Sequence, residues 1–412
     1  MRRRRDARRG SRLQRGRWTW WLAPAALVLV WTWRHLDASV EAAPAETRAT
    51  PPATTAPDPR PPPALQPPYS TQGVQARRAQ REMWQRRLER AQDALAAYRQ
   101  STRYPHESQP LEARSDQAYP NEPIAEEHAL DRDAGKAGEG ATLRTTQERV
   151  YVQGAESVRF TLSVRDSAGR ALPLRILRSS AREISPPHTG SLYPMVPLAF
   201  NDDGTSGDAT PSDGVHTAQL QPETQGFAGL FGQIRVEAAL RYQDKEGVTY
   251  FDIHYTPRAP ATWQASVRES IEDGSLVFHL GADVSEAGRY VVSARVDDAS
   301  GKPFALLTFN EEVAQGRQEF RLTLFGKLVR DVKPQFPLTL RDVIAFRLLA
   351  DTFPDRSLMP RLPGQVHVSR DHPLDAFADA EWASEERTRY LDEFSRDVAD
   401  AQSQVDRLSG DR

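Results

Sequence analysis

Cysteine is absent from this chain of 412 residues. No disulfide can therefore staple a domain in an oxidising compartment, so each domain must hold itself together by burying apolar surface, with a metal ion as a supplement. Thiol nucleophiles are excluded for the same reason. The sequence also has no HExxH, GxSxG, GxxxxGK or GxGxxG pattern, which removes the short signatures of zinc peptidases, serine hydrolases and nucleotide-binding enzymes. We accordingly predict that the protein is not an enzyme.

Long apolar runs are equally scarce, and residues 18–33 form the one exception. This run, WTWWLAPAALVLVWTW, holds five of the eight tryptophans and follows 17 residues that carry nine arginines and one aspartate. Basic segments stay in the cytoplasm, and tryptophan prefers the membrane interface. We therefore predict a transmembrane helix at residues 18–36, behind a cytoplasmic Arg-rich tail at residues 1–17, with the bulk of the chain exported. A signal peptide cleaved near residues 40–42 is the alternative.

Proline is concentrated just beyond the apolar run, since ten of the 31 prolines lie in residues 39–72. This composition favours extended segments and cannot bury a core, so residues 37–73 are expected to be a disordered linker. A second, polar linker is expected at residues 101–145. The formal net charge of −2 conceals a basic start and an acidic end. The exported part is therefore acidic, and nucleic acid is excluded as a partner.

Two amphipathic helices are predicted, over residues 74–100 and within residues 373–412. In each, apolar residues recur at spacings of three and four, which is the pattern of one helical seam. The seam residues are Trp84, Leu88, Ala91, Leu95 and Tyr98 in the first helix and Leu391, Phe394, Val398, Ala401, Val405 and Leu408 in the second. Residues 77–99 carry seven arginines against three acids, and residues 375–408 carry ten acids against four arginines. These opposite charges favour an antiparallel pair, and separate packing of each helix is the alternative.

Between the helices the apolar pattern changes to a period of two, which is typical of strands. The predicted strands are residues 150–152, 158–164, 172–177, 230–240 and 248–255, and then residues 263–267, 276–280, 290–296, 304–309, 320–324 and 343–349. Turn-forming residues separate them, and no helical pattern intervenes. Many short strands at close intervals indicate β-sandwiches. The predicted fold class is mainly β, with two tandem immunoglobulin-like β-sandwiches at residues 146–258 and 259–372.

The two series of strands share a short motif. Residues 164–172 and 296–304 each contain a strand end, a glycine turn and a return strand. Duplication of one domain explains this similarity. Convergence explains it equally well, because glycine supplies the positive φ that such turns need.

The densest polar cluster of the exported part lies in residues 201–214, NDDGTSGDATPSDG. Four carboxylates, from Asp202, Asp203, Asp208 and Asp213, fall within a dozen residues. Calcium takes six to eight oxygen ligands, and a glycine-rich loop can fold back to supply them. We therefore predict a calcium site here, although the spacing is not that of an EF-hand. The alternative is a structural loop in which the aspartates cap backbone amides.

Residues 200–220, FNDDGTSGDATPSDGVHTAQL, resemble the DDG…GD…DG-V element of extracytoplasmic bacterial immunoglobulin-like domains. Residues 288–331 are similar to the second half of bacterial proteins described as choice-of-anchor or tandem immunoglobulin-like domain proteins of unknown function. Together the likeness spans about residues 147–350. It implies the fold of two tandem sandwiches and no agreed catalytic residues. The chain departs from a common arrangement of such proteins, because its apolar segment is N-terminal rather than C-terminal.

These observations predict a single-pass protein of the bacterial inner membrane, with its bulk in the periplasm. Its sandwiches are expected to bind or scaffold another protein or a cell-envelope polymer, because sandwiches present loops and edge strands to partners. The alternative is an envelope hydrolase with a carboxylate-based site. A pocket that holds two carboxylates, one of them with a raised pKa, would favour the hydrolase.

Overall fold

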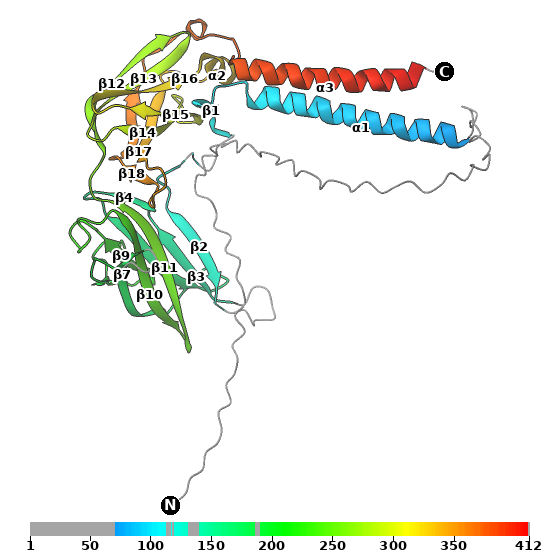
Figure 1. Cartoon of the computed structure of the whole chain (residues 1–412). Coiled ribbons are helices and arrows are strands. Elements are labelled where there is room, and N and C mark those ends of the chain that lie inside the picture. Colours follow the sequence, from blue (N-terminus) through cyan, green and yellow to red (C-terminus); the bar gives the residue numbers. More distant parts are fainter. Residues whose placement is uncertain (1–70, 113–116, 118, 131–139, 186–189, 411–412) are drawn as a thin grey trace, which may run out of the picture. The chain divides into compact units, whose positions relative to one another are not determined.

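The computed structural model describes residues 71–112, 117, 119–130, 140–185 and 190–410 (Figure 1). Strands make up most of the regular structure in these ranges, so the mainly β fold class is confirmed. The predicted tail and transmembrane helix, and residues 37–70 of the predicted linker, lie outside them. Of the helices that the described ranges contain, none combines the length and the apolar character that crossing a membrane requires.

The first sandwich consists of two sheets that share one core. One sheet has the strand order β2-β3-β5-β6, with β9 also paired to β5, and the other has the order β4-β11-β10-β7-β8. The strands are β2 (Ile124–Ala129), β3 (Thr142–Gln147), β4 (Tyr151–Gln153), β5 (Val158–Arg165), β6 (Ala171–Leu172), β7 (Arg175–Ile184), β8 (Val196–Pro197), β9 (His216–Leu220), β10 (Gly232–Tyr242) and β11 (Lys245–Thr256). Strand β4 pairs with β11 in parallel, and the other pairings are antiparallel.

The second sandwich also has two sheets around one core. Its sheets have the orders β12-β13-β16 and β1-β15-β14-β17-β18, and β19 adds to β17. The strands are β1 (Ser108–Pro110), β12 (Ala261–Glu272), β13 (Ser275–Val284), β14 (Gly288–Asp297), β15 (Pro303–Val313), β16 (Gly316–Leu324), β17 (Thr339–Leu348), β18 (Arg356–Leu358) and β19 (Leu362–Val368). A short helix, α2 (Gly326–Val332), follows β16.

Alternating side chains build both cores. In β10, every second residue from Ile234 to Tyr242 is buried, because successive side chains of a strand point to opposite faces. In the second sandwich Phe320 is fully buried, and its ring centroid lies 5.7 Å from that of Tyr290 and 5.2 Å from that of Phe309. Burying such large aromatic side chains supplies much of the driving force for folding.

The motif shared by the two series of strands forms the same turn twice. In the first sandwich the Asp166 carboxylate accepts hydrogen bonds from the backbone amides of Ala168 and Arg170, both at 2.9 Å. In the second, the Asp298 carboxylate accepts from the amides of Ser300 and Lys302 at 2.9 and 3.0 Å. The turn glycines have φ of 79° and 81°. The same local chemistry therefore closes both hairpins.

The segment between the first helix and the first sandwich contains more structure than its polar sequence predicts. Residues 101–145 include β1, which pairs with β15 of the second sandwich, and β2, which forms an edge of the first. Strand β1 has three residues, and all six residues of β2 are exposed. Neither strand therefore shows the alternation of apolar and polar residues by which strands are recognised.

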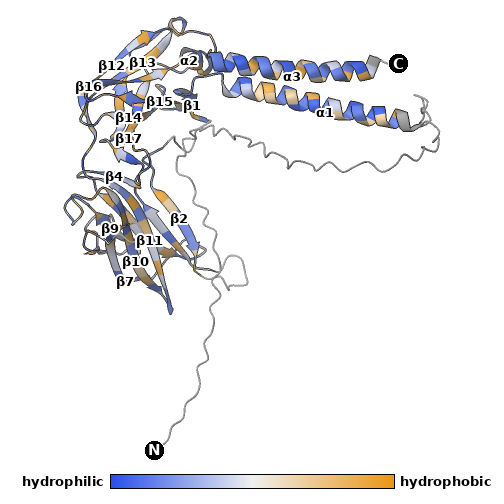
Figure 2. Cartoon of the chain, in the orientation of Figure 1, coloured by the Kyte–Doolittle hydropathy of each residue, from blue (hydrophilic) through white to orange (hydrophobic). Residues whose placement is uncertain are grey.

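The helices α1 (Thr71–Ser101) and α3 (Glu385–Gly410) run antiparallel, side by side (Figure 1). Figure 2 shows both as mostly hydrophilic, with apolar residues interspersed. Their seams meet: the Tyr98 ring centroid lies 5.2 Å from that of Phe394 and 5.7 Å from that of Tyr390. The antiparallel pair, one of the two alternatives that the sequence left open, is therefore the observed arrangement. A 3₁₀ turn, η2 (Leu374–Ala376), precedes α3.

The base of the helix pair is joined to the second sandwich by polar contacts. Asp331 of α2 pairs with Arg103 at 2.8 Å and accepts a hydrogen bond from the Tyr104 hydroxyl, also at 2.8 Å. Arg387 of α3 pairs with Glu381 at 2.6 Å and donates to Thr102 at 3.1 Å. These contacts fix the end of α1 and the start of α3 beside α2.

Candidate functional site

A pocket of about 300 Å³ lies beside β17 and is lined by Tyr119, Asn121, Glu122 and Asp342. Three of these residues come from the segment before β2, and Asp342 comes from β17. The lining combines an aromatic ring, an amide and two carboxylates. A small set of convergent polar groups around an aromatic wall is typical of ligand sites.

A β-bulge places Asp342 at this pocket. The pairing of β14 with β17 shifts register between Ser293 and Arg295, and Asp342 has φ of 54°. Positive φ inside a strand is uncommon for residues other than glycine, although aspartate tolerates it. Bulges turn a side chain away from the regular alternation and are frequent next to functional sites. Here the Asp342 carboxylate is brought to the side chains that surround the pocket.

A buried ion pair stands behind the pocket. Arg295 and Asp297 are 7% and 4% exposed, and the guanidinium Nε donates to the carboxylate at 2.8 Å. The guanidinium also lies 3.3 Å from Asp342 and 4.9 Å from the centre of the Tyr119 ring. Burial raises the pKa of Asp297, and this effect outweighs the hydrogen bond and the charge of Arg295, which lower it.

A chain of hydrogen bonds fixes the remaining polar group of the pocket. Asn121 donates to Asp342 at 3.0 Å and accepts from Arg361 at 2.9 Å. Arg361 is itself held by Glu156 of the first sandwich at 3.0 Å. The backbone amide of Gly364 donates to Asp342 at 2.8 Å. The pocket's amide and one of its carboxylates are therefore positioned before any ligand arrives.

Sequence reasoning did not identify this site. Tyr119, Asn121 and Glu122 lie in a stretch whose polar, proline-punctuated sequence indicates a linker, and Asp342 directly precedes the strand predicted at residues 343–349. Local sequence carries no signal for the site, because Asn121 and Asp342 are 221 positions apart. A hydrolase was expected to show a pocket with two carboxylates, one of which has a raised pKa, and this expectation is met in part. Glu122 and Asp342 line the pocket. The raised pKa, however, belongs to Asp297, which is not a lining residue.

The four aspartates of the predicted calcium site lie in the loop before β9, where each accepts backbone hydrogen bonds. Asp202 accepts from the amides of residues 213 and 214, both at 3.1 Å. Asp208 accepts from the Gly204 amide at 2.7 Å, and Asp213 from the Val215 amide at 2.9 Å. Hydrogen bonds from Thr205 lower the pKa of Asp203. These contacts are those of the amide-capping alternative.

Across the described ranges, no three histidine, aspartate or glutamate side chains gather in a way that could hold a metal ion. Calcium at the loop stays a prediction.

We expect Asp202→Ala to lower the unfolding free energy by about 1 kcal/mol, because two backbone amides lose their acceptor. Thermal melting of the full chain in calcium and in chelator measures both effects. If calcium binds the loop, the wild-type melting temperature is higher in calcium than in chelator, because a bound ion stabilises the folded chain by mass action. If the aspartates only cap backbone amides, the two melting temperatures are equal.

A second polar cluster covers the outer face of the β12-β13-β16 sheet. His279, 7% exposed, has Nδ1 at 2.6 Å from Glu319 and Nε2 at 2.7 Å from the Ser270 hydroxyl. Glu272 lies 3.1 Å from the same Nε2 and accepts the Ser270 hydroxyl at 2.6 Å. The serine proton is thus donated to a carboxylate, and Arg268 and Arg321 pair with Glu319 and Glu272. These residues form a network of ion pairs and hydrogen bonds on the sheet, in which both ring nitrogens of His279 have a partner.

A third cluster surrounds Glu269, whose side chain is 5% exposed. Its carboxylate lies 3.0 Å from Nε2 of His367 and 3.1 Å from Nε2 of His372. The backbone amide of Arg370 donates at 2.8 Å and its guanidinium at 3.1 Å. These contacts tie β12 to β19 and to the chain that follows it. Sequence periodicity missed the cluster, because its members are about 100 residues apart.

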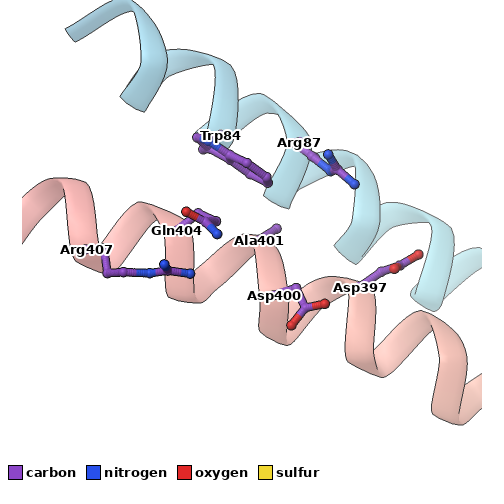
Figure 3. A pocket seen from close by; sticks show the side chains of 7 residues that line it. All are labelled: Trp84, Arg87, Asp397, Asp400, Ala401, Gln404 and Arg407. Carbon is purple, nitrogen blue, oxygen red and sulfur yellow. The ribbon is translucent and has the colours of Figure 1, made fainter. Parts of the chain in front are cut away.

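A groove of about 320 Å³ lies on the flank of the helix pair (Figure 3). It is lined by Trp84, Arg87, Asp397, Asp400, Ala401, Gln404 and Arg407. Trp84 lies over Ala401, which is 1% exposed, and the Arg87 guanidinium lies 4.9 Å from the indole centre. Of the ion pairs within 4.0 Å that the described side chains make, none joins α1 to α3. The apolar seam therefore holds the pair, and the opposite charges act at longer range.

No family model and no curated protein matches the chain. Among solved structures it is similar to a DUF4785 family protein from Legionella pneumophila, with 13% identity and a TM-score of 0.37 over 55% of this chain and 57% of that one. It is also similar to native α-2-macroglobulin of E. coli, with 14% identity and a TM-score of 0.26 over 58% of this chain and 15% of that one. A chimeric titin Z1Z2 gives 10% identity and a TM-score of 0.20 over 55% and 99%. At such scores these likenesses carry no argument, and the fold rests on the strand pairing described above.

Proposed function

We propose that this chain is an envelope protein of the bacterial inner membrane whose β-sandwiches bind or scaffold a partner. In this proposal residues 18–36 span the membrane once, residues 1–17 stay in the cytoplasm, and the described part lies in the periplasm. The partner is a protein or a cell-envelope polymer. The acidic exported part makes nucleic acid a poor partner. The likeness to choice-of-anchor proteins belongs to the same proposal, with the anchor at the N-terminal end.

One observation supports binding most directly. The Asn121 amide and the Asp342 carboxylate face a pocket of about 300 Å³ and are already held by neighbouring groups. Groups fixed in advance lose little freedom when a ligand arrives, which favours affinity. A general acid or base, by contrast, must exchange its proton during the reaction. A carboxylate already bound to two donors is poorly suited to that work.

A hydrolase is the second candidate, because the pocket holds two carboxylates and the buried Asp297 behind it has a raised pKa. Glu122 would then act as the exchanging group, since it is the exposed carboxylate of the lining. Glu122→Gln would abolish hydrolysis of the true substrate and leave the fold intact. Binding that persists in Glu122→Gln, without any turnover by the wild-type chain, favours the binding function.

Photo-crosslinking in living cells tests the binding proposal. We expect a photoreactive amino acid at position 119 to yield a discrete adduct of higher mass, because Tyr119 lines the pocket. The matched control is position 250, another tyrosine that is 41% exposed and lies under an arginine, with 4.1 Å from the Arg235 guanidinium to the ring centre. In parallel, an alkaline phosphatase fused after Arg412 should be active, because that reporter requires the periplasm. Equal adducts at both positions, or a reporter active only in the cytosol, would count against the proposal.

A further inference from the structure

Building on the proposed binding function, we propose that the pocket beside Tyr119 takes a sugar unit of an envelope polysaccharide, and that this unit is neutral or carries an amine. The inference names the ligand class of the pocket. It depends on the ring of Tyr119, on the carboxylates of Glu122 and Asp342, and on the amide of Asn121.

The Tyr119 ring provides an apolar platform. Tyr119 is 54% exposed, so about half of its surface is open to a ligand. The Arg295 guanidinium, 4.9 Å from the ring centre, supports it from one side. The ring is therefore held in place while part of its surface remains at the pocket. The C–H edges of a sugar ring carry positive partial charge and pack favourably on the negative face of an aromatic ring.

The polar groups of the lining match the hydroxyls of a sugar. Carboxylate oxygens accept hydrogen bonds from hydroxyl groups, and charge-assisted bonds of this kind are about twice as strong as neutral ones. Asp342 uses Oδ1 for Asn121 and Gly364, and its Oδ2 lies 3.3 Å from the Arg295 guanidinium. Each carboxylate oxygen can accept more than one hydrogen bond, and Glu122 adds a second, exposed carboxylate. The pocket volume of about 300 Å³ is at the lower end of the range for small-molecule sites, which suits one or two sugar units rather than a large apolar ligand.

Charge decides which sugars fit. Glu122 and Asp342 both line the pocket, so its wall is acidic. Among the described residues, two cations contact the lining. Arg295 is paired with Asp297 as well as with Asp342, and Arg361, which donates to Asn121, is paired with Glu156. An anionic sugar would therefore be repelled by the exposed carboxylate of Glu122, because like charges brought together at an interface disfavour binding. A neutral sugar meets hydrogen-bond acceptors, and an amino sugar meets acceptors of opposite charge.

Isothermal titration of the full chain in a detergent without a sugar headgroup tests the inference. The probes are tetrasaccharides of N-acetylglucosamine and of glucosamine, and a trisaccharide of galacturonic acid. We expect the first two to bind at least tenfold more tightly than the third. Tyr119→Ala should weaken binding about twofold to tenfold, which corresponds to about 0.5–1.4 kcal/mol and lies in the range typical of an aromatic contact. Tyr119→Phe should retain it, because the platform is preserved.

Tyr250→Ala is the matched control, since Tyr250 is similarly exposed and also lies under an arginine, in the first sandwich and away from the pocket lining. It should leave binding unchanged. If Tyr119→Ala fails to fold, Glu122→Gln replaces it. We expect Glu122→Gln to reduce the preference for neutral over anionic sugar. Failure of the wild-type chain to bind either neutral or amino sugar at millimolar concentration overturns the inference, as does tighter binding of galacturonate. A protein adduct at position 119 in cells would overturn it while leaving the binding function standing.

Discussion

Arg295→Met is expected to lower the free energy of unfolding by about 3–5 kcal/mol. Arg295 and Asp297 are buried together, and removing the cation leaves a carboxylate without its main partner in a poorly solvated place. The same change withdraws the support of the Tyr119 ring. Urea denaturation of the full chain measures the loss. Arg289→Met is the control on the same strand, because Arg289 is exposed and its guanidinium donates to the neutral side chain of Asn310.

The effect should depend on pH in a defined direction. Burial raises the pKa of Asp297 above its ordinary 3.8, so the folded chain holds this proton more tightly than the unfolded chain. The free energy of unfolding therefore falls as the pH rises through the raised pKa of Asp297, because the folded chain then loses a proton that it binds more tightly than the unfolded chain does. Without Arg295 the pKa rises further, so the destabilisation should be larger at pH 7 than at pH 4. The double variant Arg295→Met/Asp297→Leu should recover most of the loss. A double variant as unstable as the single one would contradict this account.

Glu269→Gln is expected to lower the free energy of unfolding by about 1.5–3 kcal/mol, the usual contribution of hydrogen bonds to a charged group. The carboxylate accepts from His367, His372 and both donors of Arg370. An amide in its place turns one hydrogen-bond acceptor into a donor that faces other donors. Thermal or urea unfolding of the full chain measures the change. Glu311→Gln is the control, because Glu311 is an exposed glutamate on a strand of the same sandwich.

The pH dependence of Glu269 runs opposite to that of Asp297. Burial raises the pKa of Glu269, but the hydrogen bonds from Arg370, His367 and His372 together hold it below 4.5. A carboxyl with a depressed pKa contributes stability that is complete above its unfolded pKa and is lost as pH falls through the folded pKa. The difference between wild type and Glu269→Gln should therefore be largest near pH 7 and shrink below about pH 4. A constant difference across that range would show that the charge of Glu269 is not the source.

Periodicity predicted the parts of the fold that bury regular patterns. The seams of α1 and α3 and the alternating strands such as β10 follow directly from residue spacing. Strands β1 and β2 escaped prediction, because one is three residues long and the other is exposed throughout. Their place is set by partners far along the chain, β15 and β3. Local spacing carries no information about such pairings.

The candidate site escaped prediction for a related reason. Its lining unites residues 119–122 with Asp342, about 220 positions later, and the network behind it reaches Glu156 through Arg361. Only the fold brings these groups together. The aspartate-rich loop, in contrast, attracted a metal prediction because its acids are adjacent in sequence. Acids that are adjacent in sequence can also accept hydrogen bonds from the backbone amides of their own loop, and the carboxylates of Asp202 and Asp208 do so.

The pairing of α1 with α3 has a mechanical consequence. Helix α1 begins at residue 71, directly after the proline-rich segment, and ends at the base where Arg103 contacts Asp331. Its 31 residues rise about 46 Å at about 1.5 Å each. A pull applied ahead of residue 71 and directed along this axis passes through the helix backbone to that base, beyond which the chain continues to β1. Tension would therefore load the pairing of β1 with β15 of the second sandwich, while the apolar seam keeps α1 alongside α3.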